Sequence, residues 1–126
     1  MAIEISPQKY AGSVRPMAFG SGERAFTVGG DTAFPFFTFE VLDFTPDDWA
    51  EACAEPYKDV LSDPVAWARK AQDEYGADFI QLWLKSTDPN GLNRSAADAA
   101  ETAKAVADAI DVPLLVWGCA NAQKDA

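Results

Sequence analysis

Histidine is absent from this chain, and cysteine is scarce, with only Cys53 and Cys119 among 126 residues. Without histidine, the chain has no His-based acid/base catalysis, no Ser–His nucleophile and no imidazole metal ligand. The two cysteines lie far apart and neither belongs to a Cys-x-x-Cys pair. A zinc site or a four-cysteine cluster would therefore lack ligands, and a disulfide framework is not expected. Much of enzyme chemistry is therefore excluded for the chain by itself.

Positive charge and long apolar runs are also scarce. Ten Lys and Arg residues face twenty Asp and Glu residues, which gives a net charge of -10. Such a surface repels phosphate backbones, so we predict no nucleic-acid partner. No apolar run approaches the roughly 18 residues of a membrane helix, and the start has neither the basic nor the apolar region of a signal peptide. We expect a cytoplasmic protein with no membrane contact.

Apolar and aromatic residues, in contrast, are plentiful. Hydrophobic residues make up 48% of the chain, including eight Phe, four Trp and three Tyr, a composition typical of one soluble globular domain. Residues 1–24 are predicted to be an irregular lead-in with one short strand near 13–19. That strand could form a hairpin with a strand at 25–28, and residues 25–126 make up the domain.

The remainder alternates between strand and helix patterns. Strands are predicted at 37–43, 78–85 and 112–117, the last one buried on both faces. Helices are predicted at 46–54, 64–75 and 95–110, entered through Thr45, Asp63 and Ser95 as N-caps, with Gly76 closing the second helix. This alternation predicts an α/β fold of parallel strands with right-handed crossovers. Both a (β/α) barrel and a doubly wound sheet fit the pattern.

Several segments resemble one known family. Residues 27–36 (Thr-Val-Gly-Gly-Asp-Thr-Ala-Phe-Pro-Phe) are similar to its opening strand and loop, and 40–43 to its second strand. Residues 57–68, 74–78, 84–91 and 112–119 continue the match in order, so that it covers about residues 12–125. On these segments the chain is identified as a member of the small (delta) subunit family of the corrinoid iron–sulfur protein in the carbon monoxide dehydrogenase/acetyl-CoA synthase system.

The resemblance implies a TIM-type (β/α) barrel, of which this chain holds about half, with roughly four parallel strands. It implies a large (gamma) subunit that carries the iron–sulfur cluster and a cobalamin domain, so that cobalamin is shared with that partner. A methyltransferase and acetyl-CoA synthase are implied as transient partners in moving a methyl group from methyltetrahydrofolate or a methanogen pterin. Two departures, a shortened loop after Phe36 and an end after the fourth strand, lead us to expect no complete active site and no catalytic residue here.

Barrel sites lie at the carboxyl ends of the strands. The cofactor-binding candidates that follow these strands are Asp43, Ser86, Thr87, Asp88, Asn90, Gly118 and Asn121. Each has a plain structural alternative: Asp-Pro-Asn-Gly is a strong turn sequence, and Asp43 could cap the helix that follows it. Gly118 would allow the backbone to approach a ligand closely.

Phe34, Phe36 and Phe37, around Pro35, could fill the core or form a wall that contacts a ligand or subunit. Three functional interpretations stay open. The first is a methyl-carrier subunit whose strand-end loops face a cobalamin held by the partner. The second is a fragment of a pterin-dependent methyltransferase, with Asp43, Asp88 and Asn121 on the pterin. The third is a half-barrel that self-associates to cover its open sheet.

Overall fold

The computed structural model describes residues 3–5, 17–19 and 37–126. Two short strands, β1 (Ile3–Ile5) and β2 (Met17–Phe19), form a two-stranded antiparallel sheet. The elements of the domain are β3 (Thr38–Leu42), α1 (Glu51–Ala54), the 3-10 helix η1 (Glu55–Tyr57), α2 (Pro64–Asp73), β4 (Phe79–Trp83), the 3-10 helix η2 (Lys85–Thr87), α3 (Ala96–Ala109) and β5 (Leu114–Trp117). No helix in these described ranges is long and apolar enough to cross a membrane.

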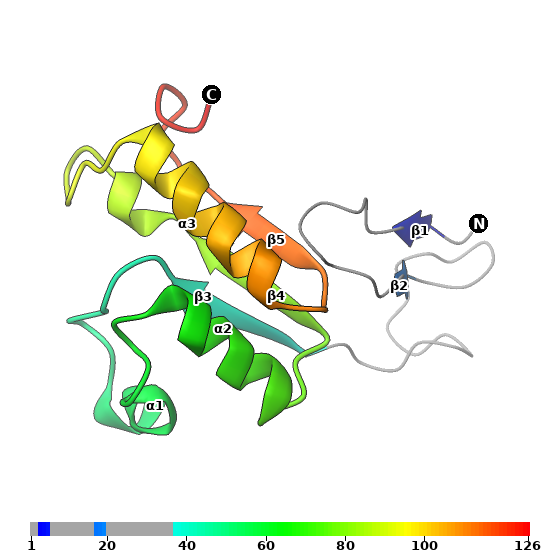
Figure 1. Cartoon of the computed structure of the whole chain (residues 1–126). Coiled ribbons are helices and arrows are strands. Elements are labelled where there is room, and N and C mark those ends of the chain that lie inside the picture. The colour runs from blue at the N-terminus through cyan, green and yellow to red at the C-terminus, as the bar shows by residue number, and fades with distance from the viewer. Residues whose placement is uncertain (1–2, 6–16, 20–36) are drawn as a thin grey trace.

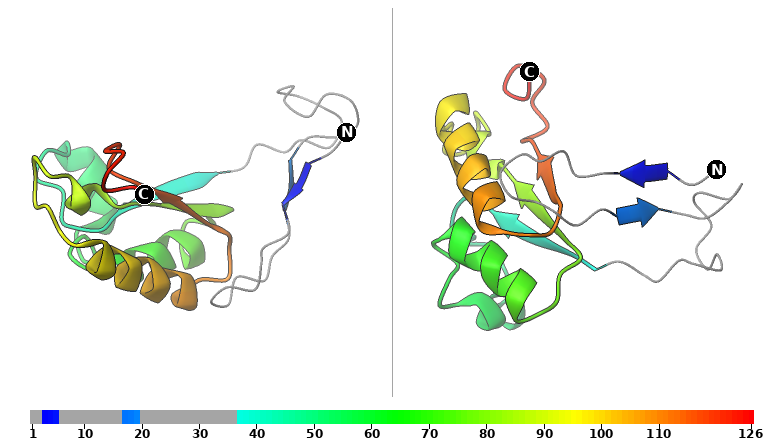
Figure 2. Two further views of the ribbon diagram at one scale, coloured as in Figure 1. Left: turned by 90° about the horizontal axis from the view of Figure 1, so that it is seen from above. Right: turned by 45° about the vertical axis from the view of Figure 1, so that its right-hand side comes forward.

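The domain is built on a three-stranded parallel sheet in the order β3-β4-β5. Helices α2 and α3 lie side by side on one face of that sheet (Figures 1 and 2). Each strand pairs with the next one along the chain, and this sequential order is compatible with part of a (β/α) barrel. The predicted α/β class with parallel strands is thus confirmed.

Two predictions for the N-terminal segment have different outcomes. The strand expected at 25–28 lies outside the described residues, so the count of four parallel strands stays a prediction. The strand expected near 13–19 is present in part as β2, but β1 pairs with it. Residues 3–5 were predicted to be irregular, and that prediction was wrong.

The core lies between the sheet and the two long helices. Its buried apolar members are Val41, Leu42, Trp67, Ala68, Ala71, Ala77, Ile80, Leu82, Val106, Ile110 and Val112. Small alanines on the inner face of α2 let the helix approach the sheet closely. The Asp63 carboxylate caps this helix by accepting from the N–H groups of Val65 (3.0 Å) and Ala66 (3.1 Å), so the predicted entry is confirmed.

Helix α3 also starts where the sequence predicted. Ser95 Oγ accepts from the N–H of Asp98 at 3.1 Å and donates to the Asp98 carboxylate at 2.7 Å. Gly76 follows α2 with a φ of +66°, a conformation that glycine adopts without a Cβ clash. Local sequence signals therefore place the starts of both long helices and the end of α2.

The helix predicted at 46–54 is wrong in its first half, because α1 begins only at Glu51 and Thr45 caps nothing. Tertiary contacts of the preceding residues explain the difference. The Trp49 ring packs edge-on against Trp67, with 5.3 Å between centroids, and Asp48 pairs with Lys85 at 3.6 Å. These contacts hold 44–50 in a nonhelical path, which outweighs the local Thr-Pro-Asp-Asp signal.

The prediction that the last strand is buried on both faces is also wrong. Leu115, Val116 and Trp117 are 45%, 54% and 57% exposed. β5 pairs only with β4 among the described residues, so it is the outer strand of the three. Phe37 is likewise 62% exposed, which excludes it from the core, whereas Phe34 and Phe36 lie outside the described residues.

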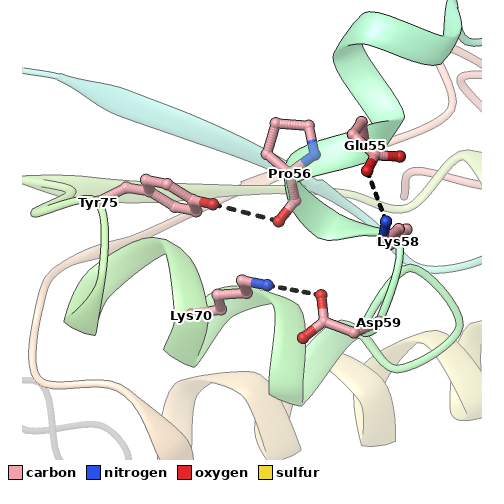
Figure 3. Close-up of polar contacts among 6 residues, drawn as sticks. All are labelled: Glu55, Pro56, Lys58, Asp59, Lys70 and Tyr75. Carbon is pink, nitrogen blue, oxygen red and sulfur yellow. Dashed lines mark hydrogen bonds and ion pairs between the residues drawn. The ribbon is translucent and has the colours of Figure 1, made fainter.

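Polar contacts fasten the α1–η1 segment to α2 (Figure 3). The Tyr75 hydroxyl donates to the carbonyl of Pro56 at 3.2 Å, and Lys70 Nζ lies 2.5 Å from Asp59. The Tyr57 ring lies 5.5 Å from Trp67 and 5.3 Å from Tyr75, measured between centroids. Burial, with a smaller contribution from the charge of Tyr75, raises the pKa of the Tyr57 phenol to about 12.

This pKa predicts an alkaline loss of stability. An unfolded tyrosine ionises near pH 10, whereas folded Tyr57 keeps its proton up to about pH 12. The unfolded state therefore releases a proton first, and the free energy of unfolding should fall as pH rises from about 10 to 12. Denaturant unfolding of wild type and Tyr57→Phe across this range checks the expectation. The wild-type curve should fall more steeply, and parallel curves would contradict it.

Candidate functional site

A buried carboxylate joins two strand ends at the carboxyl edge of the sheet. Asp43 directly follows β3 and is 3% exposed, while Ser86 lies in η2, just after β4, and is 1% exposed. The Ser86 backbone N–H donates to Asp43 Oδ1 at 3.0 Å, and the Ser86 hydroxyl donates to Oδ2. The Asp43 side chain therefore holds the 86–94 loop against β3 rather than capping the following helix, so the capping alternative was wrong.

Arg94 closes the same loop from its other end. Its Nη1 donates to the carbonyl of Asp43 at 3.3 Å, and its backbone N–H donates to the carbonyl of Ser86 at 2.9 Å. The Thr87 hydroxyl turns inward and donates to the carbonyl of Leu84 at 2.8 Å. The start of the loop is thus built from satisfied, buried polar groups.

The tip of the loop is an exposed turn organised by Asp88. Its carboxylate accepts from the N–H of Asn90 at 2.8 Å, and its carbonyl accepts from the N–H groups of Gly91 and Asn93, both at 3.0 Å. These are the contacts that the turn alternative predicted. Asn90 is exposed at the tip, and its side-chain amide donates to the same Asp88 carboxylate at 3.2 Å.

The segment after β5 forms a second, separate turn. Asn121 Oδ1 accepts from the N–H groups of Gln123 (3.1 Å) and Lys124 (3.3 Å). A Cβ at Gly118 would meet the carboxylate of Asp125 at 2.4 Å. Gly118 therefore allows a close approach by Asp125 of the same chain. Within the described residues, no hydrogen bond joins this turn to the 86–94 loop.

The structure thus brings Asp43 and Ser86 together and places Thr87, Asp88 and Asn90 in the adjoining loop. Gly118 and Asn121 follow β5 at the same carboxyl edge but belong to the separate turn. The binding of a cofactor by these residues stays a prediction. In the part of the chain that the structure describes, no three carboxylates or cysteines gather as a metal ion would require.

Sequence reasoning missed Lys85 and Trp83 at this edge. The Lys85 ammonium lies 5.4 Å from the centroid of the Trp83 ring and 5.8 Å from that of Phe44. The indole Nε1 of Trp83 is buried and has no hydrogen-bond acceptor, which costs about 1–3 kcal/mol. The only sequence signal for Lys85 and Trp83 was their position at the end of the predicted strand 78–85. That position does not reveal which side chains they contact.

Loss of the Asp43 carboxylate should destabilise the loop. Asp43→Ala leaves the N–H and hydroxyl of Ser86 without their acceptor, so we expect the free energy of unfolding to fall by about 1.5–3 kcal/mol. Asp48→Ala is the matched control, because that side chain is 64% exposed and should change stability by less than about 1 kcal/mol. Urea denaturation of both variants checks this. An equal loss of unfolding free energy in both variants would contradict the expected contribution of the buried Asp43–Ser86 bonds.

Comparison with known proteins identifies the family. The model described as CO dehydrogenase/acetyl-CoA synthase delta subunit matches residues 16–125. Similar proteins named acetyl-CoA decarbonylase/synthase complex subunit delta occur in Methanothermobacter thermautotrophicus, Methanocaldococcus jannaschii and Archaeoglobus fulgidus, at 34%, 31% and 33% identity. The matches cover 98%, 94% and 98% of this chain, but 35%, 33% and 31% of the relatives.

The chain therefore spans about a third of the length of these relatives. The match runs through the whole described domain, including the parallel sheet, the 86–94 loop and the turn after β5. By its sequence, this chain belongs to the CO dehydrogenase/acetyl-CoA synthase delta subunit family.

Proposed function

We propose that this chain is part of the small subunit of a corrinoid iron–sulfur protein. In this role it helps to move a methyl group, carried on cobalamin, between methyltetrahydrofolate or a methanogen pterin and acetyl-CoA synthase. A large subunit holds the iron–sulfur cluster and most of the cobalamin. The methyltransferase and acetyl-CoA synthase bind in turn. The observation that supports the proposal is the family match over residues 16–125. This match includes the loops at the carboxyl edge of the sheet.

The donor groups at the edge support a carrier role rather than a complete corrinoid site. The chain has no histidine to ligate cobalt, and Asp43, Ser86 and Thr87 bond within the protein. Asn90 at the exposed loop tip donates to Asp88 through its amide nitrogen. Its carboxamide oxygen, with Lys85 and Trp83 beside the loop, contacts a cofactor presented by the partner. When bound, the cobalt supplies the methyl-transfer chemistry. This chain contributes hydrogen bonds and shields the cofactor from water.

The same contacts weigh against the pterin-dependent alternative. That interpretation needs Asp43, Asp88 and Asn121 to face a ligand together. Asp43 is buried and bonded to Ser86, whereas Asn121 bonds within its own turn. No observation favours this alternative over the carrier.

A point variant at the loop tip tests the proposed role. Asn90→Ala removes an exposed carboxamide and leaves the Asp43–Ser86 bonds intact. In the complex with the corrinoid-loaded large subunit, we expect about two- to tenfold weaker association, the value of one hydrogen bond, together with a shifted corrinoid absorption band. Glu101→Ala on the exposed face of α3 is the control. Association and spectrum both unchanged in Asn90→Ala would overturn this role of the loop.

We also propose that the sheet continues beyond β5, as in a TIM-type barrel. Leu115, Val116 and Trp117 are exposed at consecutive positions, and consecutive strand residues point to opposite faces. An apolar outer strand of this kind normally receives a neighbouring strand and a covering helix. The remaining two thirds of the relatives' length is long enough to supply them, and a second copy of this chain is the alternative cover.

Light scattering distinguishes covering of β5 by further family sequence from covering by a second copy of this chain. If further family sequence covers β5, the chain by itself should be a monomer in dilute solution, and joining it to the remainder of the Methanothermobacter relative should protect the β5 amides from hydrogen exchange. Val116→Lys should reduce that protection, because a buried lysine opposes packing. Leu92→Lys, at a loop residue that is 61% exposed, is the control. A stable dimer of the isolated chain that Val116→Lys dissociates would favour the second copy instead.

A further inference from the structure

Among residues 3–5, 17–19 and 37–126, two hydrogen-bond donors at the carboxyl edge have no acceptor within hydrogen-bond distance. The indole Nε1 of Trp83 is buried without a partner, and an indole nitrogen only donates. The Lys85 ammonium has one ionic neighbour, an Asp48 oxygen at 3.6 Å, which is beyond hydrogen-bond distance. Trp67 also has an unpartnered indole nitrogen, but this residue is 0% exposed inside the core, where no ligand can reach it.

Aromatic rings position these donors. The Lys85 ammonium lies 5.4 Å from the Trp83 ring centroid and 5.8 Å from that of Phe44, distances at which a cation is attracted to a ring face. Trp83 pairs in register with Trp117, which is 57% exposed. Trp117 therefore occupies the strand position next to Trp83, whose ring lies near the lysine.

The charges around the pair are arranged for an anion despite the acidic chain. Asp43, at the end of β3, accepts from Ser86, and the nearby Asp88 carboxylate accepts from Asn90, so both carboxylates already have donors of their own. Asp48 is 64% exposed, so solvent weakens its attraction for Lys85. A donor pair without an acceptor matches an oxyanion, which only accepts hydrogen bonds.

We propose that Lys85 and Trp83 form a binding site for an oxyanion, a carboxylate or a phosphate, with the indole ring of Trp117 beside it. Binding includes one side-chain movement. Because the Trp83 Nε1 is buried, this movement must expose the indole N–H while the Lys85 ammonium pairs with the same anion. The site goes beyond the proposed carrier role, because it assigns a ligand class to residues of this chain and does not require cobalamin or a large subunit.

Nitrogen–proton correlation spectra of the isolated chain test the site. The chain has four tryptophans, and Trp83→Phe identifies the indole signal of Trp83. Titration with inorganic phosphate, and separately with acetate, should move this signal downfield with saturation, whereas chloride at equal ionic strength should not. The anion that saturates at the lower concentration identifies the preferred source, phosphate or carboxylate.

Variants separate the site from general charge effects. Lys85→Met keeps the aliphatic stem and should weaken binding by about tenfold or more, the value of a charge-assisted hydrogen bond. Lys85→Arg should retain binding, and Asp48→Asn should tighten it by removing the competing carboxylate. Lys104→Met, which removes an exposed lysine paired with Asp108 at 2.6 Å, is the matched control and should bind as wild type does.

Three outcomes of these titrations would contradict the proposed site. A Trp83 signal that does not move, or that moves equally with chloride, overturns the site. Equal affinities in wild type and Asp48→Asn also overturn it, and this comparison stands even where Lys85→Met does not fold. A loss of binding in Lys104→Met equal to that in Lys85→Met would show a general charge effect and no site.

Discussion

The buried bonds between Asp43 and Ser86 are the constraint on which the carboxyl edge depends. A carboxylate that is 3% exposed must satisfy its oxygens inside the protein, and it does so with the N–H and hydroxyl of Ser86. Because Asp43 ends β3 and Ser86 follows β4, these bonds tie the loop to the parallel register of the two strands. Arg94 then fastens the far end of the loop to the same two residues.

This arrangement divides the edge into a rigid base and an open rim. Groups at the base, such as the Thr87 hydroxyl, donate hydrogen bonds within the chain. Asn90 and Trp117 are exposed at the rim, whereas Lys85 and Trp83 are partly buried beside it. A subunit that presents a surface to a cofactor held elsewhere needs this division, since a preorganised base keeps the rim groups in place.

Much of the candidate site was predictable because strand ends are predictable. Hydrophobic runs ending at Asp43, Lys85 and Trp117 indicated parallel strands, and parallel strands bring their carboxyl ends to one edge. The roles within that edge were not predictable, because they depend on contacts between distant residues. Asp43 had a helix cap as its local alternative, but its carboxylate bonds instead to Ser86, 43 positions away. Lys85 was read only as the end of a strand, although two aromatic rings surround it.

The sequence by itself determined the family, the α/β class and the starts of α2 and α3, because these depend on local order: collinear motifs, hydrophobic periodicity and caps such as Asp63 and Ser95. Only the tertiary structure decided that 44–50 is not helical, that β5 is exposed and that the Trp83 indole lacks an acceptor. The physical reason is that burial and hydrogen bonding are satisfied between segments far apart in the chain. Local patterns state what each segment prefers, and packing decides which of those preferences is met.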